Sequence, residues 1–370
     1  MRFLQILLLL QQLIVVFSDD ITIGDSILEA TIQTSTCDES FGTLSSLQRV
    51  DERIEVALSQ TKVWIATVVD QNGMSRITSA DTDNVICNVS KLSSNELILR
   101  WNNVRENLDV FLHISIDNGF LSYDLAFKVH PGGVLSIWDY SLTPVRAKLI
   151  SSSKVFDNVG FGVVRKPGNF SNQYPQATLQ FMGLIGNPST IYVATHDANA
   201  SSKTFQMNVD ENSTYVDFQI SATLPDAGVP IQSWKNVSYP VVLSILRRGS
   251  NWYDMSMLYR HFVVEHAQWT KRGRLVDRMT SLGDWVNSTL VFVNSHWQGL
   301  DIFNTTDGDP SVVSNRVLNV KRRFNLSNGE LALHHYEWDT LGYELGSNYT
   351  KCDSEITCGF DTHYPEYVVF

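Results

Sequence analysis

The sequence is poor in charged residues, and its charge is mostly negative. Asp, Glu, Lys and Arg make up only 18% of the 370 residues, below the ~25% of an average globular chain. With 28 basic residues against 39 acidic ones, the net charge is −11. Binding to a phosphate backbone needs clustered Lys and Arg, so the composition argues against a nucleic-acid partner.

Several signatures of familiar chemistries are also missing. The chain has no Gly-X-Ser-X-Gly elbow, no P-loop and no dinucleotide fingerprint, so nothing supports an esterase, a protease or a nucleotide-dependent enzyme. Cysteine is scarce, and no Cys-X-X-Cys pair occurs among Cys37, Cys87, Cys352 and Cys358. Their wide separation argues against a zinc cluster. We expect no metal and no cofactor.

Four cysteines allow three disulfide pairings. In an oxidising compartment, the pairing between sequence neighbours joins Cys37 to Cys87 and Cys352 to Cys358. The sequence leaves the connectivity open.

Only the amino terminus carries a long apolar run. Phe3 to Phe17 are interrupted only by glutamines, follow the basic Arg2 and precede the small Ser18. This pattern is typical of a secretory signal peptide and predicts one over residues 1–18. The alternative is a membrane anchor, but the run is shorter than the ~20 residues that a spanning helix needs. We therefore expect cleavage, no stable membrane span afterwards, and a secreted or lysosomal location.

Asn-X-Ser/Thr sequons support export independently. Such acceptors lie in exposed segments, so they also predict surface positions and a glycoprotein. The sequons stand at Asn88, Asn169, Asn199, Asn212, Asn236, Asn287, Asn304, Asn325 and Asn348.

From Ile21 to Leu246, apolar and polar side chains alternate with the period of half-buried strands. The clearest case is a hairpin in which residues 108–116 and 121–129 flank Asn118-Gly119, a pair suited to the positive φ angles of a tight turn. The number of strands exceeds that of a seven-stranded sandwich, so we predict a large two-sheet β-domain over residues 19–248. The other predicted strands cover 53–70, 96–102, 134–140, 159–165, 177–185, 190–195, 203–209, 214–222 and 239–246.

The period changes after Gly249. Met255, Tyr259, Phe262 and His266 follow the spacing of an amphipathic helix, and Asn251 can cap its start. We assign residues 249–286 to a helical linker.

Residues 287–370 suggest the start of a parallel fold. A strand at 289–294, a helix at 311–325 and a strand at 331–338 form a strand–helix–strand unit, whose strands pair in parallel. Two parallel strands cannot bury both of their faces alone. The segment is therefore interpreted as incomplete.

Residues suited to ligand binding gather at the predicted strand ends. His196 and Asp197 follow a hairpin strand, where they can contact a sugar, form a turn with a hydrogen-bonded histidine, or pack between domains. The other candidates are His296 and Trp297 after the first parallel strand, His334, Tyr336, Trp338 and Asp339 on and after the second, and Asp361 and Tyr364 downstream.

As a set, these motifs resemble an uncharacterised family of glycoside-hydrolase-like proteins, whose members join a galactose-mutarotase-like β-supersandwich to a (β/α)8 barrel. The resemblance covers the chain from Tyr174 to Tyr367. It implies a supersandwich followed by the first strands and helix of a barrel. Two departures are an insertion around Asn348 and a barrel that stops at Phe370. The matching motifs are His334-x-Tyr336-x-Trp338 and Phe360-Asp361-x-x-Tyr364-Pro365-x-Tyr367.

The resemblance implies a carbohydrate partner, an oligosaccharide or glycan, bound at the carboxyl ends of barrel strands. Glycoside hydrolysis canonically needs two carboxylates. Glu337, Asp339 and Asp361 are available, but the family would place its catalytic pair on later strands, so the catalytic residues and the enzymatic activity stay open. We expect a secreted glycoside-hydrolase-like protein that acts on or binds carbohydrate. The alternative is a non-catalytic secreted glycan-binding or interaction protein.

Overall fold

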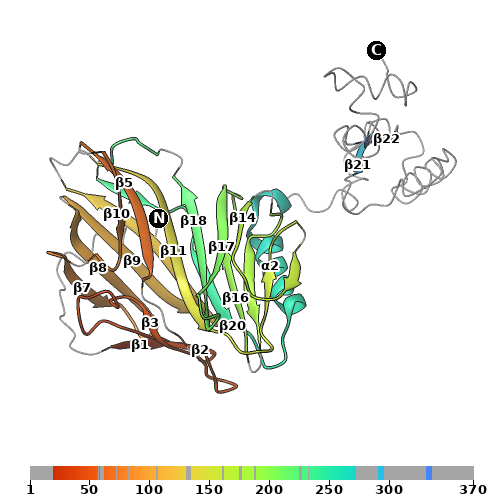
Figure 1. Cartoon of the computed structure of the whole chain (residues 1–370), viewed down its shortest axis with the longest axis horizontal. Helices are drawn as coiled ribbons and strands as arrows, with labels where there is room; N and C mark the ends of the chain where they lie inside the picture. Colours follow the sequence, from red (N-terminus) through yellow and green to blue (C-terminus); the bar gives the residue numbers. More distant parts are fainter. Residues whose placement is uncertain are drawn as a thin grey trace, which may run out of the picture. The chain divides into compact units, whose positions relative to one another are not determined.

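The computed structural model describes residues 20–271 and the backbones of two later strands. Within 20–271 it leaves out positions 57, 59–61, 72, 82, 106, 131–134, 161, 175–176, 187–188, 225–226 and 232. The chain divides into two compact units, Met1–Lys271 and Arg272–Phe370, and Figure 1 shows the elements of each. The predicted signal peptide lies outside the described residues. Among those described, no helix is long and apolar enough to cross a membrane.

The described strands of the first unit form three antiparallel sheets. The four-stranded sheet runs in the order β1 (Ile21–Gly24), β2 (Leu28–Ile32), β3 (Leu44–Arg49) and β4 (Ile54–Val56). The six-stranded sheet runs in the order β14 (Phe170–Tyr174), β17 (Lys203–Val209), β18 (Tyr215–Thr223), β11 (Ser136–Lys148), β5 (Trp64–Asp70) and β6 (Gly73–Thr78). The ten-stranded sheet runs in the order β13 (Val163–Arg165), β12 (Lys154–Asp157), β15 (Phe181–Ile185), β16 (Thr190–Thr195), β20 (Val241–Ile245), β10 (Phe120–Val129), β9 (Leu108–Asp117), β8 (Glu96–Arg105) and β7 (Ile86–Lys91), with β19 (Trp234–Asn236) beside β10.

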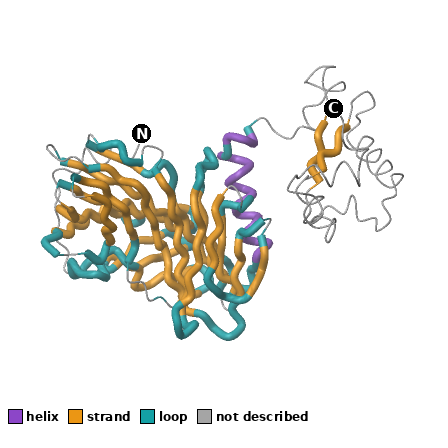
Figure 2. The backbone as a smooth tube through the Cα atoms, turned by 45° about the horizontal axis from the view of Figure 1, so that its top comes forward, coloured by secondary structure: helices purple, strands orange, loops and turns teal. Residues whose placement is uncertain are grey.

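The two larger sheets share one hydrophobic core, which makes the unit a sandwich (Figure 2). Trp64 of β5 meets Trp101 of β8 edge to face, with ring centroids 5.6 Å apart. The Tyr123 hydroxyl of β10 donates to the Pro144 carbonyl of β11 at 3.1 Å. The large two-sheet β-domain predicted from the alternation, which the family resemblance interprets as a mainly β supersandwich, is confirmed.

Some predicted strands have different limits. The single strand expected at 53–70 is divided into β4 and β5, and β1 to β3 were not predicted as separate strands. These short strands lie among Ser, Thr and Asp residues, where local alternation covers too few positions to separate strand from turn.

The predicted hairpin is confirmed as β9 and β10, in which Asp117 pairs directly with Phe120. Asn118 and Gly119 adopt φ angles of 51° and 77°, as a two-residue turn requires. The turn also joins other parts of the sandwich. The Gly119 N–H donates to the Asp25 carboxylate at 2.8 Å, and the Ser244 hydroxyl donates to the Gly119 carbonyl at 2.8 Å.

The predicted amphipathic helix is confirmed as α2 (Trp252–His266). Asn251 and Asp254 form a reciprocal capping box at its start. The helix packs on the outer face of the ten-stranded sheet, where its buried side chains Met255, Tyr259 and Phe262 meet Phe181 and other aromatic residues of β15 and β16.

Helix α2 approaches the sheet closely because β15 carries a glycine. A Cβ atom on Gly183 would lie 2.5 Å from the Met255 sulfur. The missing side chain at this position makes room for the helix.

The Cys37–Cys87 disulfide is present, with a sequence separation of 50. This confirms one of the predicted pairs, whereas Cys352 and Cys358 lie outside the described residues. In the second unit, β21 (Val291–Ser295) pairs in parallel with β22 (Leu331–His335), which confirms the predicted parallel pairing. The helix expected at 311–325 lies outside the part of the chain that the structure describes.

Replacement of Gly119 by alanine tests how tightly the β9–β10 turn is packed. A Cβ at Gly119 would lie 2.7 Å from Ile27 Cγ2, whereas one at Gly249, which has a similar positive φ of 80°, would meet nothing within 4 Å. Both substitutions place alanine at a positive φ angle and so carry a similar backbone strain. Only the alanine at position 119 also clashes with a neighbouring side chain, that of Ile27. We expect Gly119→Ala to lower the free energy of unfolding by about 1–3 kcal/mol more than Gly249→Ala in urea titrations. Equal losses would contradict this packing.

Candidate functional site

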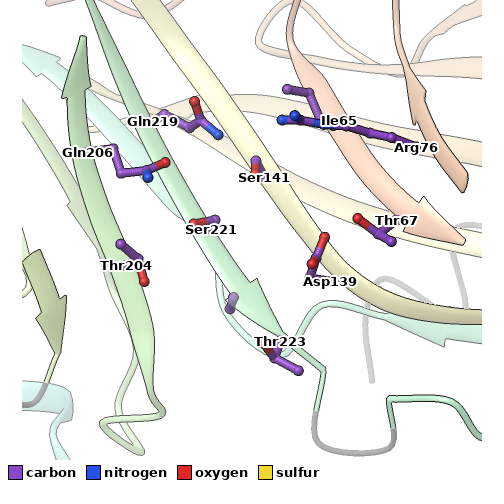
Figure 3. A pocket seen from close by; sticks show the side chains of 11 residues that line it. Ile65, Thr67, Arg76, Asp139, Ser141, Thr204, Gln206, Gln219, Ser221 and Thr223 are labelled. Carbon is purple, nitrogen blue, oxygen red and sulfur yellow. The ribbon is translucent and has the colours of Figure 1, made fainter. Parts of the chain in front are cut away.

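A polar groove of about 340 Å³ lies on the face of the six-stranded sheet that is turned away from the core (Figure 3). The strand alternation produces it, because Trp64, Ala66 and Val68 of β5 enter the core, while Ile65 and Thr67 between them point the other way. The groove is lined by Ile65, Thr67, Arg76, Asp139, Ser141, Thr204, Gln206, Gln219, Ser221, Ala222 and Thr223.

The lining side chains stand in rows across the strands. Thr67 pairs with Arg76 on one side and with Asp139 on the other, and Asp139 pairs in turn with Thr223. A second row places Ser141 beside Ser221 and Ser221 beside Thr204. A third places Gln206 beside Gln219. In Figure 3 the two glutamines lie at one end, with Asp139 and its threonine neighbours at the other.

This arrangement suits a ligand rich in hydroxyl groups. Seryl and threonyl hydroxyls and glutamine amides both donate and accept hydrogen bonds, and most of the lining groups are of these kinds. Arg76 and Asp139 are the charged residues of the described lining, and their opposite charges leave the groove without net charge. Among the described residues, no group of three His, Cys, Asp or Glu side chains is placed to hold a metal ion.

The predicted site residue His196 lies outside this groove. It follows β16, and its ring stacks on Phe262 of α2 with centroids 4.4 Å apart and planes 6° from parallel. The Phe120 ring lies 5.5 Å away. Burial, together with the nearby His266, lowers the pKa of His196 to about 4. In this position the imidazole connects helix α2 to the sandwich.

The other member of the pair, Asp197, has a buried carboxylate with several partners. It accepts hydrogen bonds from the backbone N–H groups of Asn199 and Ser201, at 2.9 and 2.6 Å, and pairs with the Lys203 ammonium at 2.7 Å. Burial alone would raise the pKa of Asp197, but the Lys203 contact and the backbone donors outweigh it and hold that pKa below its usual value. Asp197 therefore anchors the turn after β16, and its carboxylate does not face solvent.

Lys203 extends this buried cluster. Its ammonium donates to the Gln180 side-chain oxygen at 2.8 Å and lies 5.0 Å from the Tyr174 ring centroid and 4.5 Å from that of Tyr239. The ion pair, the amide and the two aromatic faces together stabilise a buried charge.

The remaining predicted site residues belong to the second unit. His334 pairs with Asn294 near the carboxyl ends of β22 and β21, where the sequence predicted a binding edge. The other predicted site residues lie outside the described residues, so their contact with carbohydrate stays a prediction. They are His296, Trp297, Tyr336, Trp338, Asp339, Asp361 and Tyr364.

The described sequons differ in exposure. Asn169, Asn199, Asn212 and Asn236 are exposed, and Asn88 in β7 is half-buried. The other sequon asparagines, Asn287, Asn304, Asn325 and Asn348, lie outside the described residues.

The groove is not predictable from local sequence patterns because its residues come from strands distant in the chain. One signal was present. In the predicted strands 203–209 and 214–222, the residues facing away from the apolar positions are Thr204, Gln206 and Asn208 on the first and Tyr215, Asp217, Gln219 and Ser221 on the second. Most of these side chains can form hydrogen bonds, and such a face on two consecutive strands is compatible with a polar binding surface.

Comparison with known proteins finds a curated relative and several similar solved structures. No protein-family model matches the chain. The chain is 28% identical over 369 residues to a curated protein of Monosiga brevicollis named "Putative glycoside hydrolase 22789", and the match covers 95% of this chain and 30% of that protein. The chain thus spans less than a third of this relative. The resemblance to glycoside-hydrolase-like proteins drawn from the motifs is confirmed by this relative.

Among solved structures, similarity is found at low sequence identity. A quadruple mutant of a Bifidobacterium bifidum α-N-acetylgalactosaminidase is 10% identical with a TM-score of 0.49, over 88% of this chain and 53% of that one. A GH36 α-galactosidase of Geobacillus stearothermophilus is 10% identical with a TM-score of 0.47, over 88% and 57%. A galactose-mutarotase-related enzyme of Lactobacillus acidophilus is 7% identical with a TM-score of 0.40, over 62% and 98%.

The partly buried position of His196 predicts an acid-sensitive contact between α2 and the sandwich. The folded chain keeps His196 neutral down to its pKa of about 4, whereas an unfolded histidine takes up a proton near pH 6.5. The unfolded state therefore binds more protons between these values, and stability falls as pH drops through this window, by up to ~3 kcal/mol.

We expect His196→Phe, which retains an aromatic ring against Phe262, to flatten the dependence of the urea midpoint on pH between 6.5 and 4. The control His261→Gln changes an imidazole that is mostly exposed on α2 and should leave the dependence as in the wild type. An unchanged slope in His196→Phe would show that another group is responsible.

Proposed function

We propose that this chain is the carbohydrate-binding sandwich of a secreted, N-glycosylated, glycoside-hydrolase-like protein, and that it binds a glycan in the groove of the six-stranded sheet. The observation that carries the proposal is the groove lining, which consists mainly of hydroxyl and amide side chains. Sugars present many hydroxyl groups that both donate and accept, and such a lining can satisfy them along its length. The similarity to a protein named as a glycoside hydrolase supports the same class of ligand.

In the groove itself, we propose binding rather than hydrolysis. Cleavage of a glycosidic bond canonically uses two carboxylates on opposite sides of that bond, and the described lining residues include a single carboxylate, Asp139. Hydrolysis, if the whole protein carries it out, is assigned to residues outside the groove. The groove is therefore proposed to bind a glycan in either case, whether the whole protein is a glycoside hydrolase or a non-catalytic glycan-binding protein.

Secretion is part of the proposal and has two supports. The apolar run before Ser18 is typical of a signal peptide, and the Cys37–Cys87 disulfide suits an oxidising compartment. The exposed asparagines of the described sequons are accessible to the glycosylation machinery.

Glycan binding is tested with the full chain produced in a secretory cell line. We expect the purified protein to retain neutral gluco-, galacto- or manno-oligosaccharides on a glycan array. Removing two groove amides, in Gln206→Ala/Gln219→Ala, should weaken binding roughly tenfold in calorimetric titration, because each hydrogen bond contributes about 0.5–1.5 kcal/mol.

The matched control is Gln48→Ala/Gln268→Ala, which removes two amides that do not line the groove. It should bind like the wild type. A folded wild-type chain that retains no glycan would refute the proposal, and equal binding by both double variants would place the site elsewhere.

If the chain is secreted, it should carry N-linked glycans. Expressed with its own amino terminus, the chain should appear in the medium and lose mass on treatment with peptide-N-glycosidase F. Isotope-labelled deglycosylation should mark Asn169, Asn199, Asn212 and Asn236, whose side chains are exposed, more fully than the half-buried Asn88. Retention in the cytosol with every sequon unmodified would contradict the proposed location.

A further inference from the structure

A β-bulge in β11 changes which side chains reach the groove. Ile137 pairs with Val68 and Asp139 pairs with Thr67, so Trp138 is an extra residue on its strand. A bulge of this kind sets two residues opposite one and redirects side chains. Its effect appears in the burial pattern, because Ile137 and Tyr140 are both in the core while the two residues between them are not.

Trp138 is therefore directed away from the core beside a groove residue. Its side chain is 41% exposed. Asp139, the next residue, lines the groove. Trp138 is not itself a lining residue of the groove, but it adjoins the groove through Asp139.

The Trp138 ring is supported from one side by backbone. A Cβ atom at Gly228, in the loop that follows β18, would lie 3.4 Å from ring atom Cζ3. The Leu224 N–H donates to the Trp138 carbonyl at 3.1 Å, which fixes the bulge to the same loop. The hydrogen bond restricts the backbone that carries the ring, which lowers the ordering cost of a contact with the ring.

The polar groups beside the ring are available to a ligand. Asp139 stands between Thr67 and Thr223, and Arg76 follows beyond Thr67. Among the described residues, neither the Asp139 carboxylate nor the Arg76 guanidinium forms an ion pair with another side chain. A carboxylate can accept from two adjacent hydroxyl groups at once, and a guanidinium can donate to a third oxygen.

We propose that Trp138, Asp139 and Arg76 form the recognition end of the groove for a neutral hexopyranose. The C–H face of the sugar ring packs on Trp138, and two adjacent hydroxyl groups donate to the Asp139 carboxylate. Arg76 donates to a further oxygen of the same sugar, and the hydroxyl and amide rows contact the rest of the glycan. This inference rests on the proposed glycan-binding function and adds the chemical class of the sugar that is recognised.

The charges determine which sugars fit. Asp139 and Arg76 carry opposite charges, so the groove has no net charge that would attract an ionised sugar. An acidic sugar that keeps its hydroxyl contacts with Asp139 would hold its own carboxylate close to that residue, and this repulsion between like charges opposes any gain from pairing with Arg76. We therefore expect neutral hexoses to be preferred over sialic acid.

The test measures binding of defined probes to the full secreted chain. Methyl glycosides of glucose, galactose and mannose, and N-acetylneuraminic acid, are titrated at millimolar concentrations while tryptophan fluorescence and calorimetric heat are recorded. We expect at least one neutral glycoside to bind and the acidic sugar to bind at least tenfold more weakly. Equal affinity for the acidic sugar would overturn the neutral preference.

Variants test the Trp138 and Asp139 contacts separately. Trp138→Ala should weaken the bound glycoside at least tenfold, whereas Trp138→Phe, which retains an aromatic face, should stay within about threefold. Asp139→Asn should also cost about tenfold or more, because the charged acceptor is lost. The control Trp269→Ala removes another tryptophan, 47% exposed near the end of α2, and should bind like the wild type.

The outcomes distinguish this inference from the function on which it rests. If the array glycans bind and Gln206→Ala/Gln219→Ala weakens them, while Trp138→Ala and Asp139→Asn do not, the recognition end is wrong and the groove function stands. If the folded wild type binds neither array glycans nor probes, both are refuted. Far-ultraviolet circular dichroism of each variant confirms that a loss of binding is not a loss of fold.

Discussion

The constraint on which the sandwich depends is that every strand has two faces and only one of them can enter the shared core. Contacts such as that between Trp64 and Trp101 fill the space between the two large sheets and account for one face of each. The outer faces of the two large sheets differ in what covers them. The ten-stranded sheet covers part of its outer face with α2, whereas the six-stranded sheet leaves its outer face to hydroxyl, amide and charged groups. The candidate site is thus the face that the fold did not need to bury.

Elements whose signals are local were predictable from the sequence. The β9–β10 hairpin depends on two adjacent residues that tolerate positive φ, and α2 depends on a cap and on a stripe of apolar side chains within a few turns. The parallel pairing of β21 and β22 followed from a strand–helix–strand order. Each of these needs information from a single stretch of chain, which is what an amino-acid sequence presents directly.

The groove could not be derived in the same way, because it depends on register between distant strands. Arg76 and Gln219 line one surface only because β6, β5, β11 and β18 are neighbours in the sheet. His196 and Asp197 show a second limit. The sequence suggests one shared role for two adjacent polar residues, but the imidazole stacks against the helix while the carboxylate turns into a buried ion pair. Burial separates their chemistry, and nothing in the local pattern indicates which residue is buried.

The bulge in β11 shows how a binding surface can arise by a change in strand length. In a regular strand, the position before an outward-facing residue points into the core, and a tryptophan there would compete for space with Ile137 and Tyr140. Because of the extra residue, Trp138 and Asp139 both face outward and Tyr140 returns to the core. The inward-facing positions on each side of the bulge therefore still match the core. Insertions and deletions at this point of β11 would therefore add or remove an aromatic surface without repacking the interior, so related chains can differ in ligand preference while they retain the same core.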